Sequence, residues 1–185
     1  MVEIVVNPFT PSDRDRWAEL WCSYLDFYET RLPPEVYRHT WQRLIAPEGA
    51  IRGLGARLGG PTAPLVGIAH YLFHPHAWTA KEVCYLQDLF VDPTARRGSV
   101  GRTLIEAVAV AARGRGCHRL YWTTKEDNAT ARSLYDRIAR FNGFAATGVD
   151  SDFSRGVNYY DHYYTDPACP WSWGLEPSLR RLAVA

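Results

Sequence analysis

The chain has 185 residues, 46% of them hydrophobic and 14% aromatic, which is enough for one domain with its own core and too short for two typical ones. The formal net charge is +1 with both signs spread along the sequence, so composition argues against nucleic-acid or membrane partners. The four cysteines form no CxxC pair, and we find neither a basic leader with an apolar core nor a long apolar run. We therefore expect a cytoplasmic protein with reduced thiols and no metal.

The first third of the chain predicts one short strand and two helices. Residues 3–6 form the strand, and Thr10 caps a helix with Asp13 three positions later, a variant of the capping box. A second helix begins near Glu35. One face of the first helix carries large side chains at helical spacing, at positions 17, 20, 21, 24, 25 and 28. This stripe predicts core packing. Because aromatic faces hold cations, it also suits the wall of a site for a cationic ligand.

Residues 50–58 and 65–73 predict a hairpin whose loop is rich in glycine and proline, with residues 74–78 leaving the second strand. His70, His74 and His76 share strand parity, so a metal cluster is conceivable if the strand continues. Pro75 argues against that cluster. A single histidine acting as a base and a surface loop are the other interpretations.

The stretch at residues 85–117 predicts a buried strand, a turn rich in arginine and glycine, and an alanine-rich helix. Its strand is expected over residues 83–91 and ends at Asp92 and Pro93, and the helix begins at the glycine turn. A helix N-terminus has free backbone N–H groups and the positive end of the dipole, so this unit suits an anion. Arg96, Arg97 and Arg102 add positive charge there.

Residues 118–124 predict the next strand, and a helix opens after residue 126 and closes at residues 142–143. Residues 144–149 and 157–164 predict a last hairpin. We expect one domain over residues 1–164. We expect the tail, residues 165–185 with its two tryptophans, to dock on this domain or on a partner subunit.

Two motifs resemble a known family. The segment RRGSVG at residues 96–101 resembles the Arg/Gln-x-x-Gly-x-Gly/Ala loop with which GNAT N-acetyltransferases hold the pyrophosphate of acetyl-CoA, with Ser99 at the first glycine position. The segment NATARSLY at residues 128–135 resembles the Asn-x-x-Ala-x-x-x-Tyr helix of the same superfamily. The closest likeness, judged from residues 86–93 and 121–124, is to the polyamine and histone-type branch.

The resemblance covers roughly residues 2–164 and implies an α/β (α+β) fold. Its sheet is mixed and mainly antiparallel, with about six to seven strands and about four helices on both faces. It implies a sheet splayed open between the strands that end near Val91 and Thr124. It also implies an acyltransferase with acetyl-CoA as cosubstrate, a small-molecule amine as acceptor, direct attack in a ternary complex, and a possible homodimer.

The resemblance assigns the acetyl-CoA site residue by residue. Tyr135 matches the tyrosine that protonates the departing thiolate, and without the motif it would be an ordinary buried tyrosine. Asn128 caps its helix by residue type and contacts coenzyme A by resemblance. The full set expected to bind the cosubstrate is Leu89, Phe90, Val91, Arg96, Arg97, Gly98, Ser99, Val100, Gly101, Arg102, Asn128, Ala131 and Tyr135.

The base that removes the proton of the amine is the least determined part of the predicted site. Polyamine-type relatives have a glutamate where Gln87 stands, and an amide cannot accept a proton. Asp88 is the alternative candidate, although strand alternation turns it to the opposite face from Gln87 unless a bulge intervenes. A structural carboxylate is the other interpretation of Asp88. The residues expected to bind the acceptor are Asp26, Tyr28, Glu29, Gln87 and Glu126.

Other functions remain open at this point. Ser99 and Gln87 depart from the family pattern, as they would in a module that binds acetyl-CoA without transferring it. By contrast, Asn128, Tyr135 and the arginine-glycine turn argue against such a module. An acetyltransferase acting on protein lysines is another alternative. The turn lacks the Gly-Lys-Ser/Thr ending of a P-loop and the three-glycine dinucleotide fingerprint, which disfavours a nucleotide-binding protein.

Overall fold

The computed structural model describes residues 2–96, 99–124, 128–139, 144–146 and 163–165. The chain divides into two units, Met1–Trp122 and Thr123–Ala185, and each is described by itself. The predicted domain boundary at residue 164 and the predicted docking of the tail fall largely outside the described residues.

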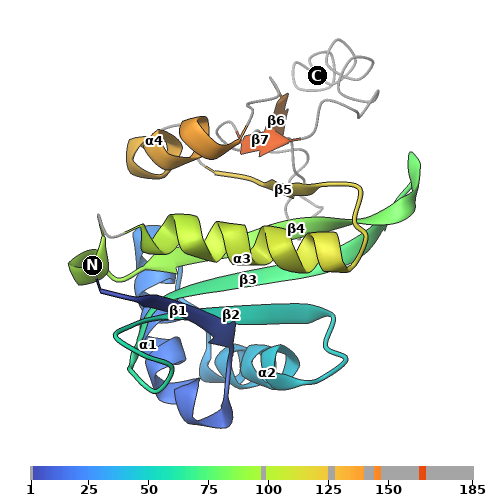
Figure 1. Ribbon diagram of the computed structural model, residues 1–185. Coiled ribbons are helices and arrows are strands. Elements are labelled where there is room, and N and C mark those ends of the chain that lie inside the picture. Colours follow the sequence, from blue (N-terminus) through green and yellow to red (C-terminus); the bar gives the residue numbers. More distant parts are fainter. Residues whose placement is uncertain (1, 97–98, 125–127, 140–143, 147–162, 166–185) are drawn as a thin grey trace, which may run out of the picture. The chain divides into compact units, whose positions relative to one another are not determined.

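The first unit is built on a five-stranded sheet in the order β1-β2-β3-β4-β5 (Figure 1). Each neighbouring pair among the first four strands is antiparallel, and β5 runs parallel to β4. Their bounds are β1 (Ile4–Pro8), β2 (Ile51–Leu58), β3 (Leu65–His76), β4 (Thr79–Val91) and β5 (Leu120–Trp122). The sheet is therefore mixed and mainly antiparallel, as the sequence predicts, with five strands in this unit.

Helices cover both faces of this sheet (Figure 1). The helices α1 (Arg14–Phe27) and α2 (Pro34–Ile45) lie on one face, and α3 (Val100–Gly114) lies on the other. Two short 3-10 helices, η1 (Pro11–Asp13) and η2 (Pro93–Ala95), precede α1 and α3. The predicted arrangement of helices on both faces of one sheet is confirmed.

The start of α1 is held by the predicted capping residues. The backbone N–H of Thr10 donates to Asp13 Oδ2 over 2.7 Å, which closes one half of a capping box. Asp13 is itself buried, and both of its carboxylate oxygens accept from Arg57 Nη2 of β2 over 2.8 Å. A buried carboxylate needs such a partner, so this ion pair ties the helix start to the sheet.

The core on the α1 and α2 face is largely aromatic. Trp17 stacks on Trp21 with ring centroids 5.1 Å apart, and Trp41 of α2 lies 5.1 Å from Trp17. Trp17 and Leu20 are almost fully buried, so the large side chains of the α1 stripe pack in the core. The buried side chains of α3 are instead aliphatic: Val100, Leu104, Ile105, Val108 and Ala112.

The hairpin between β3 and β4 differs from its prediction. The strand β3 continues through His76, beyond the expected end at residue 73, and β4 begins at Thr79 rather than at residue 83. Pro75 does not end β3, because the pairing of the two strands is irregular between His74 and His76 and tolerates a residue without a backbone N–H.

The second unit contains α4 (Ala129–Ile138) and a two-stranded antiparallel sheet of β6 (Phe144–Ala146) and β7 (Tyr163–Thr165). Asn128 caps α4, because its Oδ1 accepts from the backbone N–H of Ala131 over 3.2 Å. The predicted helix is present, and β6 pairs with β7 within the predicted last hairpin, the rest of which lies outside the described residues.

Candidate active site

A bulge interrupts β4 in its middle. His70 of β3 pairs with Asp88, and the next residue of β3, Tyr71, pairs with Leu86, so Gln87 is the extra residue on β4. The side chain of Gln87 is exposed and that of Asp88 is buried. The bulge that the sequence allowed but did not predict is therefore present. It places Asp88 and Leu86 on opposite faces of the sheet.

One edge of β4 is unpaired beyond this bulge. Pairing with β5 covers only Cys84, Tyr85 and Leu86, while β4 continues to Val91. Within the described part of the first unit, the backbone of residues 87–91 thus pairs with β3 on one side only. Such an edge offers N–H and C=O groups to an extended ligand in the way that a sheet accepts an added strand. Leu89, Phe90 and Val91, which the resemblance assigns to the cosubstrate, lie along this edge.

The strand leads into a turn fixed by Asp92. The Asp92 carboxylate accepts from the backbone N–H and the hydroxyl of Thr94, at 2.9 and 2.7 Å, and from Arg16 Nη2 of α1 at 2.6 Å. These bonds, those from Thr94 foremost, hold the pKa of Asp92 below its ordinary value. Arg16 also donates from Nε to the carbonyl of Leu65. The helix α1, the start of β3 and the end of β4 are therefore joined just before the arginine-glycine turn.

The turn enters α3 through Ser99, whose φ of 64° is left-handed. This conformation favours glycine, and the family pattern has glycine here. Ser99 therefore has a backbone conformation that a glycine at this position would adopt without strain. The backbone N–H groups of Val100, Gly101 and Arg102 open α3, where a helix leaves its donors free and its dipole is positive.

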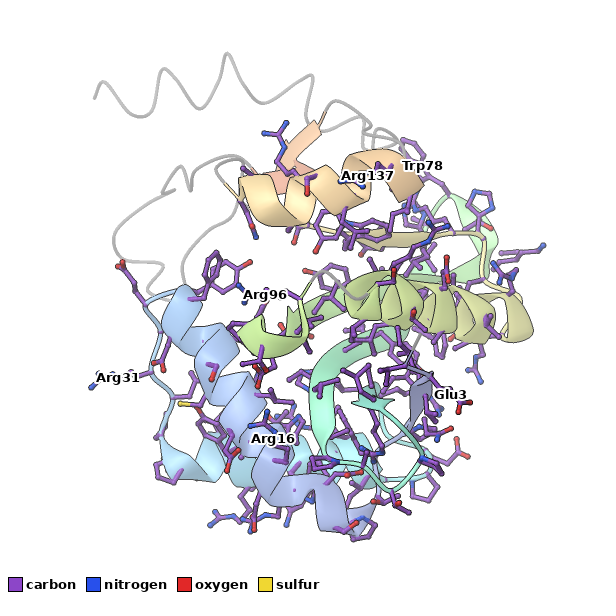
Figure 2. All side chains as sticks on the ribbon, turned by 60° about the vertical axis from the view of Figure 1, so that its left-hand side comes forward. Glu3, Arg16, Arg31, Trp78, Arg96 and Arg137 are labelled. Atoms are coloured by element: carbon purple, nitrogen blue, oxygen red, sulfur yellow. The ribbon has the colours of Figure 1, made fainter. Side chains whose placement is uncertain are left out.

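The arginines of this region differ in their contacts. Arg96 is exposed at the end of η2 (Figure 2) and donates from Nε to the carbonyl of Val91. Its guanidinium carbon lies 5.7 Å from the Phe90 ring centroid. Arg102 is exposed and pairs with Glu106 one turn along α3, at 2.8 Å. Arg97 and Gly98 lie outside the described residues. Arg96 is thus the described arginine that the fold itself places beside the free edge of β4.

Three buried polar side chains lie on the α1 side of the bulge. The indole N–H of Trp17 donates to His70 Nε2 over 2.8 Å, and His70 Nδ1 lies 2.7 Å from Asp88 Oδ2. Trp17 and His70 are each 1% exposed and Asp88 is 8% exposed. The sequence points to His70 and Asp88 separately, because a contact between residues on two strands leaves no signal in either strand alone.

Tyr24 of α1 lies close to this group. Burial raises the pKa of its phenol well above the ordinary value, and the negative charge of Asp88 raises it further. The ring of Tyr24 contacts Tyr28 at 5.0 Å and Phe90 at 6.4 Å between centroids, both edge to face. The aromatic stripe of α1 thus packs in the core at its start and reaches Phe90 of β4 near its end.

The acidic candidates of α1 stand at its C-terminal end. Asp26 and Glu29 are both exposed, and Tyr28 between them is half-buried. The backbone N–H of Glu29 donates to the carbonyl of Asp26, and that of Thr30 donates to the carbonyl of Leu25. This is a Schellman ending, and Glu29 occupies its left-handed position with a φ of 52°.

The remaining sequence candidates lie in or near the second unit. Asn128, Ala131 and Tyr135 belong to that unit, Asn128 as the cap of α4 and Tyr135 half-buried on it. Glu126 lies outside the described residues. The contacts of these residues with acetyl-CoA therefore stay predictions.

The other histidines of the hairpin have contacts of their own. His74 Nε2 is 2.8 Å from the hydroxyl of Tyr121, and Arg119 Nη2 is 2.8 Å from His76 Nε2. In the part of the chain that the structure describes, no three His, Cys, Asp or Glu side chains gather as metal ligands would. No helix among the same residues has the length and apolar character needed to cross a membrane.

Two curated enzymes resemble this chain, one over most of its length and the other over less than half. The D-amino-acid N-acetyltransferase HPA3 of Saccharomyces cerevisiae is 40% identical over 136 residues, which are 74% of this chain and 84% of HPA3. The thialysine N-epsilon-acetyltransferase of Bos taurus is 33% identical over 81 residues, 43% of this chain and 47% of that enzyme.

A short segment of the chain is similar to an enzyme of another class. Thirty residues of the chain are 67% identical to the 3-oxosteroid 1-dehydrogenase of Mycolicibacterium smegmatis, and they make up 16% of this chain and 5% of that enzyme. So small a share of the dehydrogenase does not bring its activity to this chain.

The fold has solved counterparts. A structure of AAC(6')-Iy in complex with the bisubstrate analog CoA-S-monomethyl-acetylneamine superposes with a TM-score of 0.62 at 15% identity, over 73% of this chain and 88% of that one. The sequence profile of the acetyltransferase (GNAT) family matches residues 15–141, more than half of the chain. The chain belongs to the acetyltransferase (GNAT) family and is an N-acetyltransferase that uses acetyl-CoA as its cosubstrate.

Proposed function

We propose that the protein transfers the acetyl group of acetyl-CoA to a primary amine of a small molecule of the amino-acid type. The observation that carries the acetyl-CoA site is the free edge of β4, which continues past its last pair with β5 and leads into the N-terminus of α3. An extended amide chain pairs with the edge, and a pyrophosphate binds at the helix N-terminus. The acceptor class rests on the enzymes that resemble the chain, named for D-amino acids and thialysine.

The reaction divides among backbone and side chains. The amine nitrogen attacks the thioester carbonyl carbon, and backbone N–H groups of residues 87–91 stabilise the oxyanion. The C–S bond then breaks, and Tyr135 gives its proton to the thiolate. The proton of the amine leaves through water toward the exposed carboxylates of Asp26 and Glu29, which also attract the cationic form of the acceptor.

The first experiment mixes the protein with acetyl-CoA and an amine panel and follows free thiol. The panel contains D- and L-amino acids, thialysine, polyamines, aminoglycosides and lysine-bearing peptides. Release with amino acids, reduced by about 10²-fold or more in Tyr135→Phe, supports the proposal. Release with peptides alone points to a protein-lysine enzyme. Tight acetyl-CoA binding with no release from any amine overturns the proposal in favour of a binding module.

A matched pair of arginine variants tests the acetyl-CoA site. Arg96 stands four residues before α3 and Arg113 in its last turn, and both are exposed. Arg96→Ala is expected to raise the KM for acetyl-CoA by about 10-fold with little change in KM for the amine, because it removes one charge-assisted contact with phosphate. Arg113→Ala is the control and should leave both values unchanged. Equal effects of the two variants would refute a site at the N-terminus of α3.

Two further proposals rest on sequence. We propose a homodimer, tested by light scattering of the eluting protein, and a single mass of about one chain would refute it.

We also propose a cytoplasmic location. Cys22, Cys84 and Cys117 are free thiols, and burial, together with Cys117, raises the pKa of Cys84 to about 12.

A further inference from the structure

The buried group of Trp17, His70 and Asp88 has a defined direction of hydrogen bonding. An indole N–H can only donate, so His70 Nε2 must accept from Trp17. The proton of the imidazole is then on Nδ1 and is donated to Asp88 Oδ2 over 2.7 Å. Because Trp17 already occupies Nε2, His70 cannot pass a proton onward. The group therefore fixes geometry and does not relay protons.

This hydrogen bond joins the two strands directly beside the bulge. His70 and Asp88 are partners in the pairing of β3 with β4, and Gln87, the next residue along β4, is the bulged one. A shift of β4 by one residue would turn Asp88 to the other face and break its bond with His70. The bond thus favours the register that has its extra residue at Gln87, and a buried donor left without a partner would penalise any other register.

The surroundings of Asp88 favour positioning over catalysis. Its carboxylate faces the side of the sheet covered by α1, where Phe90 and Ile68 on the same face belong to the apolar core. One oxygen bonds to His70, and the charge acts on the buried phenol of Tyr24. A base must reach the amine or a water beside it, whereas these contacts keep Asp88 within the core.

We propose that Asp88 is a positioning residue: with His70 and Trp17 it locks the bulge at Gln87 and so sets the direction of the free edge of β4. The inference rests on the proposed function, which assigns that edge to acetyl-CoA. What the lock requires of Asp88 is an oxygen that accepts a hydrogen bond. It does not require a group that takes up a proton.

Two substitutions of Asp88 separate these roles. Asp88→Asn keeps an oxygen that accepts from His70 and loses the ability to take a proton, whereas Asp88→Ala loses both. If Asp88 locks the bulge, Asp88→Asn should keep kcat and the Kd for coenzyme A within about 3-fold of wild type. Asp88→Ala should lower kcat and raise the Kd, each by about 10-fold or more. If Asp88 is the base, Asp88→Asn should lower kcat by about 10²-fold or more and leave the Kd unchanged, which overturns the proposal.

Variants of His70 give a second pair, which serves also if Asp88→Ala does not fold. The side-chain N–H of an asparagine lies close to the position of Nδ1, so His70→Asn should restore part of the coenzyme A affinity that His70→Leu loses. A loss of equal size in both variants would mean that ring packing alone matters and would contradict the lock.

Nitrogen-15 NMR of the histidine rings tests the lock without any turnover. Wild type should show His70 protonated on Nδ1, and Trp17→Phe should lose that single tautomer because the donor to Nε2 is gone. A wild-type ring protonated on Nε2 would overturn the proposal. If no amine is acetylated, the proposed function fails, while the tautomer and the Kd for coenzyme A still decide whether the lock exists.

Discussion

The helices on the two faces of the sheet are built from different side chains and do different things. The buried residues of α3 are aliphatic, whereas α1 and α2 bury Trp17, Trp21 and Trp41. An aliphatic interface gains from close approach and has no polar atom to satisfy. Indole and phenol rings fill as much space and also carry an N–H or O–H, so the α1 face can hold a buried carboxylate beside the bulge.

The largest effect is expected from a cavity on the α3 face. Leu104 is fully buried, and Leu104→Ala should lower the free energy of unfolding by about 2–5 kcal/mol, because the surrounding side chains fill the space only partly. Urea unfolding measures the change. Val110→Ala, on the exposed side of the same helix, is the control and should change stability by less than about 0.5 kcal/mol. A loss below about 1 kcal/mol for Leu104→Ala would show that this face is loosely packed.

On the aromatic face, the expected loss comes mainly from a hydrogen bond. Trp17→Phe keeps a ring but leaves His70 Nε2 buried without its donor, which should cost about 1–3 kcal/mol in the free energy of unfolding. Trp21 is the matched control, since it stacks on Trp17 and among the described residues makes no side-chain hydrogen bond. Equal losses for Trp17→Phe and Trp21→Phe would remove the proposed difference between the two faces.

A third variant probes close approach at the α3 face. A Cβ on Gly67 would lie 3.1 Å from Leu104 Cδ1, 3.1 Å from the Phe90 carbonyl oxygen and 3.2 Å from Val100 Cγ1. Gly67→Ala should therefore destabilise the protein by about 1–3 kcal/mol through overpacking. A Cβ on Gly114, in the last turn of α3, would meet nothing within 4 Å, so Gly114→Ala should leave stability unchanged or raise it. Thermal unfolding of both variants measures the two effects. A neutral Gly67→Ala would contradict the tight packing.

The smallest effect on stability is expected at two residues with left-handed backbone, one next to a helix on each face of the sheet. Ser99 before α3 and Glu29 after α1 both have left-handed backbone, with φ of 64° and 52°. Replacement of either by glycine should raise the free energy of unfolding by about 0.5–1 kcal/mol, because the Cβ penalty of that conformation is removed. Ser99→Gly should leave the KM for acetyl-CoA unchanged, and Glu29→Gly should raise the KM for the amine. A destabilised Ser99→Gly would show that the serine side chain contributes to the turn.

Much of the fold follows from patterns within single elements. The spacing of Trp17, Leu20 and Trp21 predicts the buried face of α1, and Thr10 with Asp13 predicts its start. The arginine-glycine turn and the Asn128 cap point to the family, and the chain belongs to it. These signals are local, because helical periodicity and caps depend on residues only a few positions apart.

The sequence alone therefore indicates most of the helices and strands, the family and the arginine-glycine turn. The packing of distant segments places the bulge of β4 and brings Asp88 to His70 and His70 to Trp17. Cross-strand register depends on pairing between distant segments, and a shift of one residue exchanges the faces of a strand. No pattern within β4 alone contains that choice, so the role of Asp88 became visible only when β3 and α1 were packed against it.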